Sequence, residues 1–238
     1  FSLFTRVMLI EQPPFLYRVL YPKALWRVKI PHQKTVYLTF DDGPIPEVTP
    51  WVLDVLDRYD AKATFFCVGD NVRKYPYLFE DILHSGHQVG NHTFHHLQGW
   101  LTRSKKFLDD SNEADRLIGS TLFRPPHGHM IFPQPLLLKK NGYKIVMWDV
   151  VTRDYNAKLS PGQVLENVKK YTRDGSIIVF HDSLKAERNM KYALPRAIEW
   201  LKEEGYTFEL IPAMPKISRA PGNPDPPAIP AAGAFNQR

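Results

Sequence analysis

The chain lacks the features that mark disulfide-rich, membrane-spanning and nucleic-acid-binding proteins. Cys67 is the only cysteine among 238 residues, so no disulfide can form within the chain. No stretch reaches the ~18 consecutive apolar residues that indicate a transmembrane helix, and no run of Lys and Arg is long enough to mark a nucleic-acid-binding tail. We therefore predict no transmembrane segment, no nucleic-acid partner and, by default, a monomer.

The first residues also lack a recognisable export signal. Residues 1–10 are apolar in character, but Glu11, Pro13 and Pro14 follow them, and no small-residue cleavage site is present. This favours the cytoplasm by default, whereas an insoluble cell-wall substrate would require export, so the sequence leaves localisation open. The 31 basic against 25 acidic residues give a net charge of +6, which slightly favours anionic partners.

Short β-rich runs alternate with amphipathic segments along most of the chain. Thr49 and Pro50 are typical of a helix start, and Gly86 follows a helical stretch as a stop signal. Seven segments have the composition of strands, namely 35–40, 63–68, 88–91, 121–123, 144–150, 176–180 and 207–211.

Regular alternation of strand and helix favours right-handed crossovers and a parallel sheet. We predict an α/β fold, a distorted (β/α) barrel with about seven parallel strands; a doubly wound open sheet is the alternative. We divide the chain into an N-terminal extension (1–34), a catalytic domain (35–212) and a Pro/Ala-rich tail (213–238), whose composition predicts disorder.

Five polar clusters follow the predicted strands, at the end where barrel and α/β enzymes assemble their active sites. Because the carboxyl ends of parallel strands meet at one rim, we expect these clusters to converge. The clusters are residues 41–44, residues 91–96, residues 124–128, Asp149 with Asp154, and His181 with Asp182.

Two of the clusters indicate a metal site. His92 and His96 are four residues apart, which on a helical turn places both imidazoles on one side, where they can share an ion. Asp41 and Asp42 leave a strand in different directions, so one can bind the metal while the other accepts a proton. Taken alone, Asp-Asp-Gly-Pro is equally well a turn, and a lone histidine is more often structural. Three protein ligands leave a position for water and substrate, as in catalytic sites.

Four motifs occur in order between residues 35 and 211. They are Thr-Phe-Asp-Asp-Gly-Pro at 39–44, His-Thr-Phe-His-His at 92–96, Phe-Arg-Pro-Pro-His-Gly at 123–128 and Val-Phe-His at 179–181. These motifs resemble the first, second, third and fifth motifs of the polysaccharide deacetylases, carbohydrate esterase family 4, which share the NodB homology domain. The resemblance implies an enzyme that removes acetyl groups from a sugar polymer with the help of a metal ion.

The resemblance also implies the metal ligands and the base. Asp42, His92 and His96 would hold one divalent ion, for which we expect Zn, with Co and Ni as alternatives. Asp41 would be the general base, and Arg124 would orient its carboxylate, a task for which a planar guanidinium is suited.

Two further positions follow from the resemblance. His181 would be the general acid that protonates the leaving amine. The backbone N–H of His127 would stabilise the negative charge on the acetyl oxygen. The family usually has Tyr at this position, and the change is expected to preserve a backbone donor while altering the sugar pocket.

The fourth motif departs from the family pattern of Asp, two residues, Asp and Trp. This chain has Val151 in the first position, followed by Asp154 and Tyr155. The resemblance assigns the missing first carboxylate to the acid histidine, so we expect His181 to have a lower pKa than usual, with Asp149 or Asp154 as substitute partner. Tyr155 is expected to contact the substrate.

Together these residues predict a metal-dependent hydrolase of non-peptide C–N bonds. Its substrate would be an acetylated glycan, N-acetylated or O-acetylated, such as peptidoglycan or chitooligosaccharide. One alternative is a hydrolase that cleaves another amide or ester with the same metal site, because fold and metal do not select the acyl group. The other is a catalytically weakened glycan-binding module, suggested by the departures at His127, Val151 and Tyr155.

Overall fold

The structure is a computed structural model, and it describes residues 11–213. Its strands are β1 (Thr35–Asp41), β2 (Ala63–Cys67), β3 (Gln88–Asn91), β4 (Leu122–Phe123), β5 (Lys144–Ile145), β6 (Val150–Val151), β7 (Ser176–His181) and β8 (Thr207–Phe208). Its helices are α2 (Phe15–Leu20), α3 (Thr49–Arg58), α4 (Gly69–Lys74), α5 (Pro76–His84), α6 (Ser104–Ile118), α7 (Gln134–Lys140), α8 (Pro161–Tyr171) and α9 (Glu187–Glu203), with short 3₁₀ turns η1 (Gly99–Leu101) and η2 (Pro126–Gly128).

The strands form one parallel sheet that curls into a distorted barrel. Seven strands follow the order β5-β4-β3-β2-β1-β7-β6, and β8 pairs with β1. The predicted fold class is therefore confirmed. The predicted strand over residues 144–150 is wrong in one respect, because only its two ends are strands and they lie at opposite edges of the sheet.

Residues 146–149 cross between these two edges and close the barrel. The Val146 N–H donates to the carbonyl of Phe123 at the end of β4 (2.8 Å), and the Asp149 N–H donates to the carbonyl of Ile177 in β7 (2.9 Å). Since the segment bridges a gap without strand geometry, the alternation of side chains along a strand does not apply to it.

Residues 11–34, the described part of the predicted N-terminal extension, pack along the outer strands. The Leu25 N–H donates to the carbonyl of Ile145 (2.8 Å), and the Leu25 carbonyl accepts from the Met147 N–H (2.7 Å). On the other edge, the Val151 N–H donates to the carbonyl of Glu11 (2.8 Å). The C-terminal tail predicted to be disordered, residues 213–238, lies outside the described part of the chain except for its first residue.

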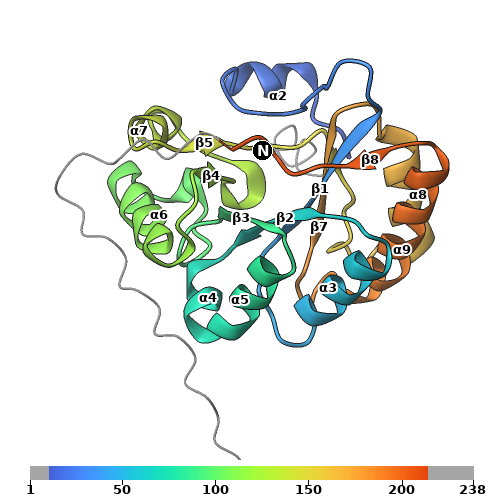
Figure 1. The fold of residues 1–238 in the computed structure, drawn as a ribbon. Helices are drawn as coiled ribbons and strands as arrows, with labels where there is room; N and C mark the ends of the chain where they lie inside the picture. Colours follow the sequence, from blue (N-terminus) through green and yellow to red (C-terminus); the bar gives the residue numbers. More distant parts are fainter. Residues whose placement is uncertain (1–10, 214–238) are drawn as a thin grey trace, which may run out of the picture.

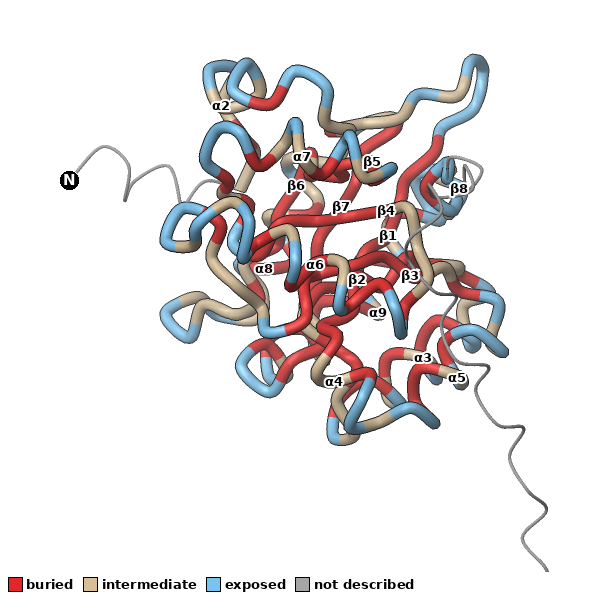
Figure 2. Tube along the Cα trace, turned by 90° about the vertical axis from the view of Figure 1, so that its left-hand side faces the viewer, coloured by how far each residue is buried: buried red, intermediate tan, exposed pale blue. Residues whose placement is uncertain are grey.

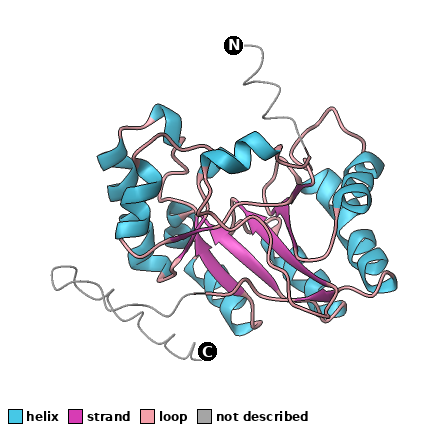
Figure 3. Ribbon diagram, turned by 90° about the horizontal axis from the view of Figure 1, so that it is seen from above, coloured by secondary structure: helices cyan, strands magenta, loops and turns pink. Residues whose placement is uncertain are grey.

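Helices surround the sheet, from α6 through α4, α5 and α3 to α9 and α8 (Figure 1; Figure 3). The strands between them are the most buried part of the chain, and the outer helix faces are exposed (Figure 2). β1 is buried along its whole length because β2 and β7 flank it and helices cover the sheet. None of the helices within residues 11–213 combines the length and apolarity that a bilayer crossing requires.

The parallel register brings the ends of the strands to one rim. Asp41, the last residue of β1, pairs with His181, the last residue of β7. Cys67 at the end of β2 pairs with Asn91 at the end of β3, and Asn91 in turn pairs with Phe123 of β4. The clusters that follow β1, β3, β4 and β7 therefore leave the sheet at the same level, as predicted from the sequence. Asp149 does not join them, because its side chain binds Ser176 at the opposite end of β7.

Candidate active site

The three residues expected to bind metal lie together at this rim. The Asp42 Oδ1 is 3.2 Å from the His96 Nε2 and 3.8 Å from the His92 Nε2. One ligand atom of each residue lies within 4.8 Å of the others, a spacing suited to a single ion. Two imidazoles and one carboxylate suit Zn and similar divalent ions and leave a coordination position open. These residues fit the ion that the sequence motifs imply.

His92 is well prepared for this role. Its Nδ1 is 2.8 Å from the backbone carbonyl of Arg124, a contact that directs the Nε2 toward Asp42 and His96. Burial lowers the pKa of His92 to about 4, so the imidazole is neutral near pH 7, which is the form that binds metals. The pKa of Asp42 also suits metal binding. Burial alone would raise this pKa, but the neighbouring histidines hold it low, so the carboxylate stays ionised.

The loop geometry differs from the predicted helical turn. β3 ends at Asn91, and the chain then takes positive φ angles at Thr93 (63°) and His96 (53°). These turns bring the rings of His92 and His96 within 5.1 Å of each other. The two histidines four residues apart thus lie side by side as expected, but a loop and not a helix positions them. The prediction of a helical turn is wrong.

Asp41 lies beside the metal trio and is bound by Arg124. The Arg124 Nη1 donates to the Asp41 Oδ1 at 2.7 Å and to the Thr39 Oγ1 at 2.8 Å. The Arg124 Nη2 donates to the carbonyl of Met147 at 2.9 Å, and the guanidinium lies 4.1 Å from the ring centre of Phe66. Arg124 is fully buried, so this single side chain connects β1, the chain after β4 and the closing segment. It fixes the direction of the Asp41 carboxylate.

His181 is bound by Asp154, which settles the question of its partner. The Asp154 Oδ1 is 2.8 Å from the His181 Nδ1, and its Oδ2 accepts the His181 N–H at 2.8 Å. Burial alone would lower the pKa of His181, but the charge and hydrogen bond of Asp154 outweigh it and raise that pKa to about 9. The predicted low pKa for His181 is therefore wrong, since Val151 does not leave the imidazole without a carboxylate.

Asp149, the other suggested partner, has different contacts. Its Oδ1 accepts from the Nη2 atoms of Arg18 (2.6 Å) and Arg173 (2.7 Å), and its Oδ2 accepts from the Ser176 Oγ (2.8 Å). The side chain is fully buried in this network, which ties α2 to the start of β7. Asp149 is structural, and its suggested pairing with His181 is wrong.

We predict that Asp154→Asn moves the alkaline limit of activity toward lower pH. As a general acid His181 would have to be protonated, so activity would fall as pH rises through its pKa, and loss of the Asp154 charge lowers that pKa. The alkaline limb of kcat/KM should shift by about 1 to 3 pH units. The folded-state pKa of about 9 exceeds the ordinary 6.5, so the variant also loses stability that is fully present below pH 6.5 and disappears toward pH 9. Asp149→Asn is the control, and a limb that moves equally in both variants would contradict the assignment.

The two residues expected near the substrate also reach the site. The ring of His127 lies 4.9 Å from that of His96, and the His127 backbone has a positive φ of 58°. The ring of Tyr155 packs edge-on against His181, with 4.9 Å between ring centres. His127 therefore lies beside one of the expected metal ligands, and Tyr155 lies beside the expected acid.

Two buried aspartates hold the metal-ligand loops, and sequence reasoning assigned no role to either. Asp182 accepts the Gly43 N–H through Oδ1 (3.1 Å) and the Thr49 hydroxyl through Oδ2 (2.7 Å). Its fit is close, since a Cβ on Gly43 would lie 1.9 Å from the Asp182 Oδ2. Burial raises the pKa of Asp182 to about 8. It anchors the loop in which Asp42 takes a positive φ of 84°.

Asp110 on α6 holds the other loop in the same manner. Its Oδ1 accepts the N–H groups of Phe94 (2.7 Å) and His95 (3.1 Å), and its Oδ2 is 2.6 Å from the His95 Nδ1. Asp110 and His95 also form a group with Glu113 that has metal-ligand spacing. Because Asp110 is fully engaged with this loop, we interpret that group as a support for His96. In sequence, a carboxylate that binds backbone N–H groups has no distinguishing pattern.

We predict that Asp182→Ala weakens binding of the divalent ion by about 10- to 100-fold, the usual effect of losing a support behind a metal ligand. The loss arises because the Gly43 N–H loses its acceptor and the loop carrying Asp42 is released. Titration with a competing chelator measures the affinity. Asp182→Asn keeps the volume and one acceptor oxygen, so its affinity should lie between wild type and Ala. Wild-type affinity in the Ala variant would contradict the prediction.

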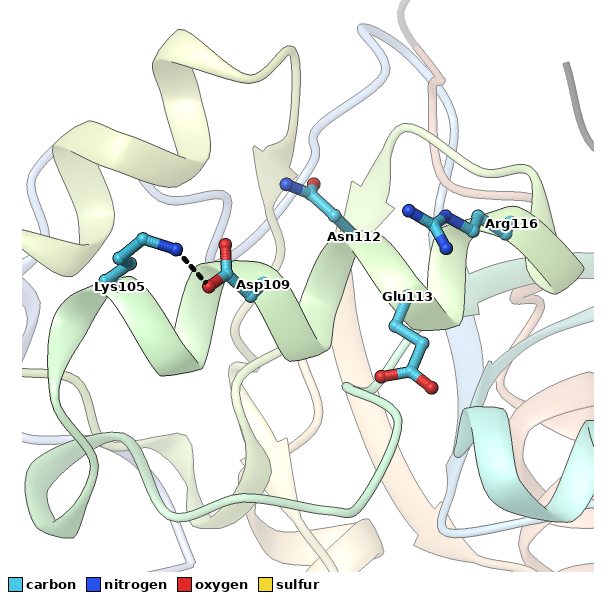
Figure 4. A pocket seen from close by; sticks show the side chains of 5 residues that line it. All are labelled: Lys105, Asp109, Asn112, Glu113 and Arg116. Carbon is cyan, nitrogen blue, oxygen red and sulfur yellow. Dashed lines mark hydrogen bonds and ion pairs between the residues drawn. The ribbon is translucent and has the colours of Figure 1, made fainter. Parts of the chain in front are cut away.

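The outer face of α6 carries a shallow hollow that is separate from this site. Its lining comes from one helix only: Lys105, Asp109, Asn112, Glu113 and Arg116 (Figure 4). Lys105 and Asp109 bind each other there at 2.7 Å. None of the motif residues lines this hollow, so the chemistry belongs to the barrel rim.

A parallel barrel whose rim carries an Asp-His-His group, a buried carboxylate and a carboxylate-bound histidine is typical of metal-dependent hydrolases. The chain belongs to the polysaccharide deacetylase family, whose model matches residues 29–146. A peptidoglycan-N-acetylglucosamine deacetylase of Bacillus cereus is 34% identical over an alignment of 184 residues that covers 74% of this chain and 86% of that protein. A peptidoglycan-N-acetylmuramic acid deacetylase of Bacillus subtilis is 33% identical over 190 residues, covering 75% of this chain and 70% of that protein.

Solved structures agree with this assignment. The crystal structure of a peptidoglycan N-acetylglucosamine deacetylase in complex with 4-naphthalen-1-yl-N-oxidanyl-benzamide matches with a TM-score of 0.74 and 30% identity, covering 82% of this chain and 94% of that one. The predicted family and function are therefore confirmed: the protein is a metal-dependent carbohydrate deacetylase, a hydrolase of acetylated polysaccharide that acts on non-peptide C–N bonds.

Proposed function

We propose that the protein removes N-acetyl groups from the glycan strands of peptidoglycan, with Asp41 as base, His181 as acid and zinc held by Asp42, His92 and His96. The observation that carries this proposal is the convergence of these side chains, drawn from the ends of the three strands β1, β3 and β7, at one rim. The names of the two Bacillus relatives favour peptidoglycan over other acetylated glycans. The protein acts as a monomer in this proposal.

Asp42, His92 and His96 would hold the ion, which would supply Lewis acidity for lowering the pKa of water and polarising the acetyl carbonyl. Asp41 takes the proton of the attacking water, and Arg124 keeps its carboxylate in position by binding the Oδ1. The backbone N–H of His127 donates to the oxygen that gains negative charge.

His181 completes the reaction. Asp154 binds its Nδ1, which leaves the Nε2 to carry the transferable proton. As the bond between carbon and nitrogen breaks, His181 gives this proton to the leaving nitrogen, so the products are acetate and a free amine. A pKa of about 9 keeps the imidazole protonated at neutral pH, as an acid requires. The Asp154 pairing thus supports the role proposed for His181.

Acetate release from a panel of glycans tests the proposed function. Purified protein loaded with zinc is mixed with peptidoglycan, N-acetylglucosamine oligomers and acetylated xylan, and free acetate and free amine are measured. We expect both products from peptidoglycan at equal yield. Acetate from xylan alone would indicate an O-acetyl esterase, and glycan binding without acetate would indicate a binding module. The metal content of the protein as purified, together with activity restored by Zn, Co or Ni after chelation, tests the choice of ion.

A further inference from the structure

A ledge of exposed apolar side chains lies beside the active site. We define it as Trp100 and Leu101 of η1 together with Ile131 and Phe132 before α7. Trp100 is 38% exposed, and the other three are 78%, 40% and 81% exposed in that order. Large apolar side chains lose about 1.5–3 kcal/mol each when they are left in water, and clusters of them mark binding surfaces. None of the reaction steps above uses the ledge.

The ledge is rigidly built from two loops. The buried Gln134 donates through Nε2 to the carbonyls of Gly99 (2.8 Å) and Thr102 (2.9 Å), and its Oε1 accepts the Ile131 N–H (3.0 Å). The loops also touch directly, because a Cβ on Gly99 would lie 2.4 Å from the carbonyl oxygen of His129. Gln134 is 1% exposed, and these hydrogen bonds hold together the two loops that carry the exposed residues of the ledge.

The indole of Trp100 is held by a stacking contact and remains partly exposed to solvent. Its ring stacks on His129 with 4.6 Å between centres and 14° between planes. His129 is fixed from behind by the Tyr17 hydroxyl, 3.1 Å from its Nδ1. One face of the indole is thus supported by an aromatic ring, and part of it stays exposed to solvent. Such preorganisation reduces the entropy lost when a flat apolar face binds a ligand.

The ledge is continuous with the site. His129 lies two residues after His127, whose ring contacts that of the metal ligand His96. A polymer with its acetyl group at the metal must extend over the rim along its chain, and Trp100 lies near that rim, four residues after His96 and stacked on His129. We propose that the ledge is a glycan subsite, in which a sugar ring of the substrate polymer other than the reacting one stacks its apolar face on Trp100. This inference rests on the proposed function, because it takes the polymer to be a glycan.

Binding measurements in the Asp41→Asn background test the ledge without turnover. Affinities for N-acetylglucosamine oligomers, from the monosaccharide to the hexasaccharide, are measured by calorimetry. We expect affinity to rise with length and to gain about 5- to 10-fold at the length that first reaches the ledge, the scale of one aromatic contact. Trp100→Ala should abolish that gain and leave the shortest oligomers unaffected, whereas Trp100→Phe should keep most of it.

Controls separate the ledge from folding and from the reaction. Tyr77→Ala removes a comparably exposed aromatic from α5 and should leave the length dependence intact. With Asp41 restored, Trp100→Ala should raise KM for long oligomers and leave kcat unchanged, since the contact is the same before and during the reaction. Affinity that does not depend on length, or a gain that survives Trp100→Ala, would overturn the subsite. Absence of acetate release with the length dependence intact would overturn the deacetylase function alone.

Discussion

Replacing Asp41 by Asn is expected to lower kcat by about a thousandfold, within the range of about 10²- to 10⁴-fold attributed to a positioned general base. In the wild-type protein the Arg124 Nη1 lies 2.7 Å from the Asp41 Oδ1. The amide keeps the shape of the carboxylate and one oxygen for this contact, but it cannot take a proton from water. Asp41 is 5% exposed, so bulk solvent does not replace it. Acetate release from an N-acetylglucosamine oligomer, followed over time, measures the effect.

The matched control for this change is Asp54→Asn on the exposed face of α3, which should leave kcat at the wild-type value. The bound metal content of Asp41→Asn should also equal that of wild type, because Asp42, His92 and His96 are unchanged. If Asp41→Asn keeps more than about a tenth of the wild-type kcat, the loss is too small for a general base, and Asp41 does not have that role.

Arg124→Met should cause the largest loss of stability of any single change in the site. The guanidinium is fully buried, and its removal leaves the Asp41 carboxylate and the carbonyls of Val146 and Met147 without their donors. Breaking a buried ion pair by removing one partner costs about 3–5 kcal/mol. Urea denaturation should show a midpoint shifted to lower urea with a similar slope.

A double variant identifies the cause of that loss. If the uncompensated charge of Asp41 dominates, Arg124→Met combined with Asp41→Asn should be more stable than Arg124→Met alone. Arg124→Lys should recover only part of the stability, because a point charge cannot replace a planar fork that binds a carboxylate and two carbonyls. Equal stability of the single and double variants would place the cost in the lost carbonyl contacts instead.

The meeting of these side chains at one rim could be predicted from short sequence patterns because each pattern is local. Asp41 and Asp42 leave the end of β1, and His92 and His96 follow β3, so neighbours in sequence define neighbours in space. The parallel order of strands then brings separate motifs to one rim without any further information. The same holds for Arg124, which follows β4 directly.

The sequence could not decide whether Asp149 or Asp154 is the partner of His181, and the reason is physical. Treating residues 144–150 as one strand placed Asp149 on the same face as Val151, but the barrel closes through residues 146–149 without strand geometry. Asp149 consequently turns to Arg18 and Arg173, and Asp154 reaches His181 from the following turn. Likewise, positive φ angles at Thr93 and His96 have no sequence signal in residues that usually avoid them.

The hydrogen bonds of residues 11–27 to the outer strands have a consequence for handling the protein. A chain trimmed to residue 35, the boundary that composition alone suggests, would lose the Glu11 carbonyl from β6 and the Leu25 groups from the β5 side. The backbone groups exposed by this truncation form open sheet edges, at which strands of separate molecules can pair. Solubility of a shortened protein would then be limited by self-association, even with every catalytic side chain present.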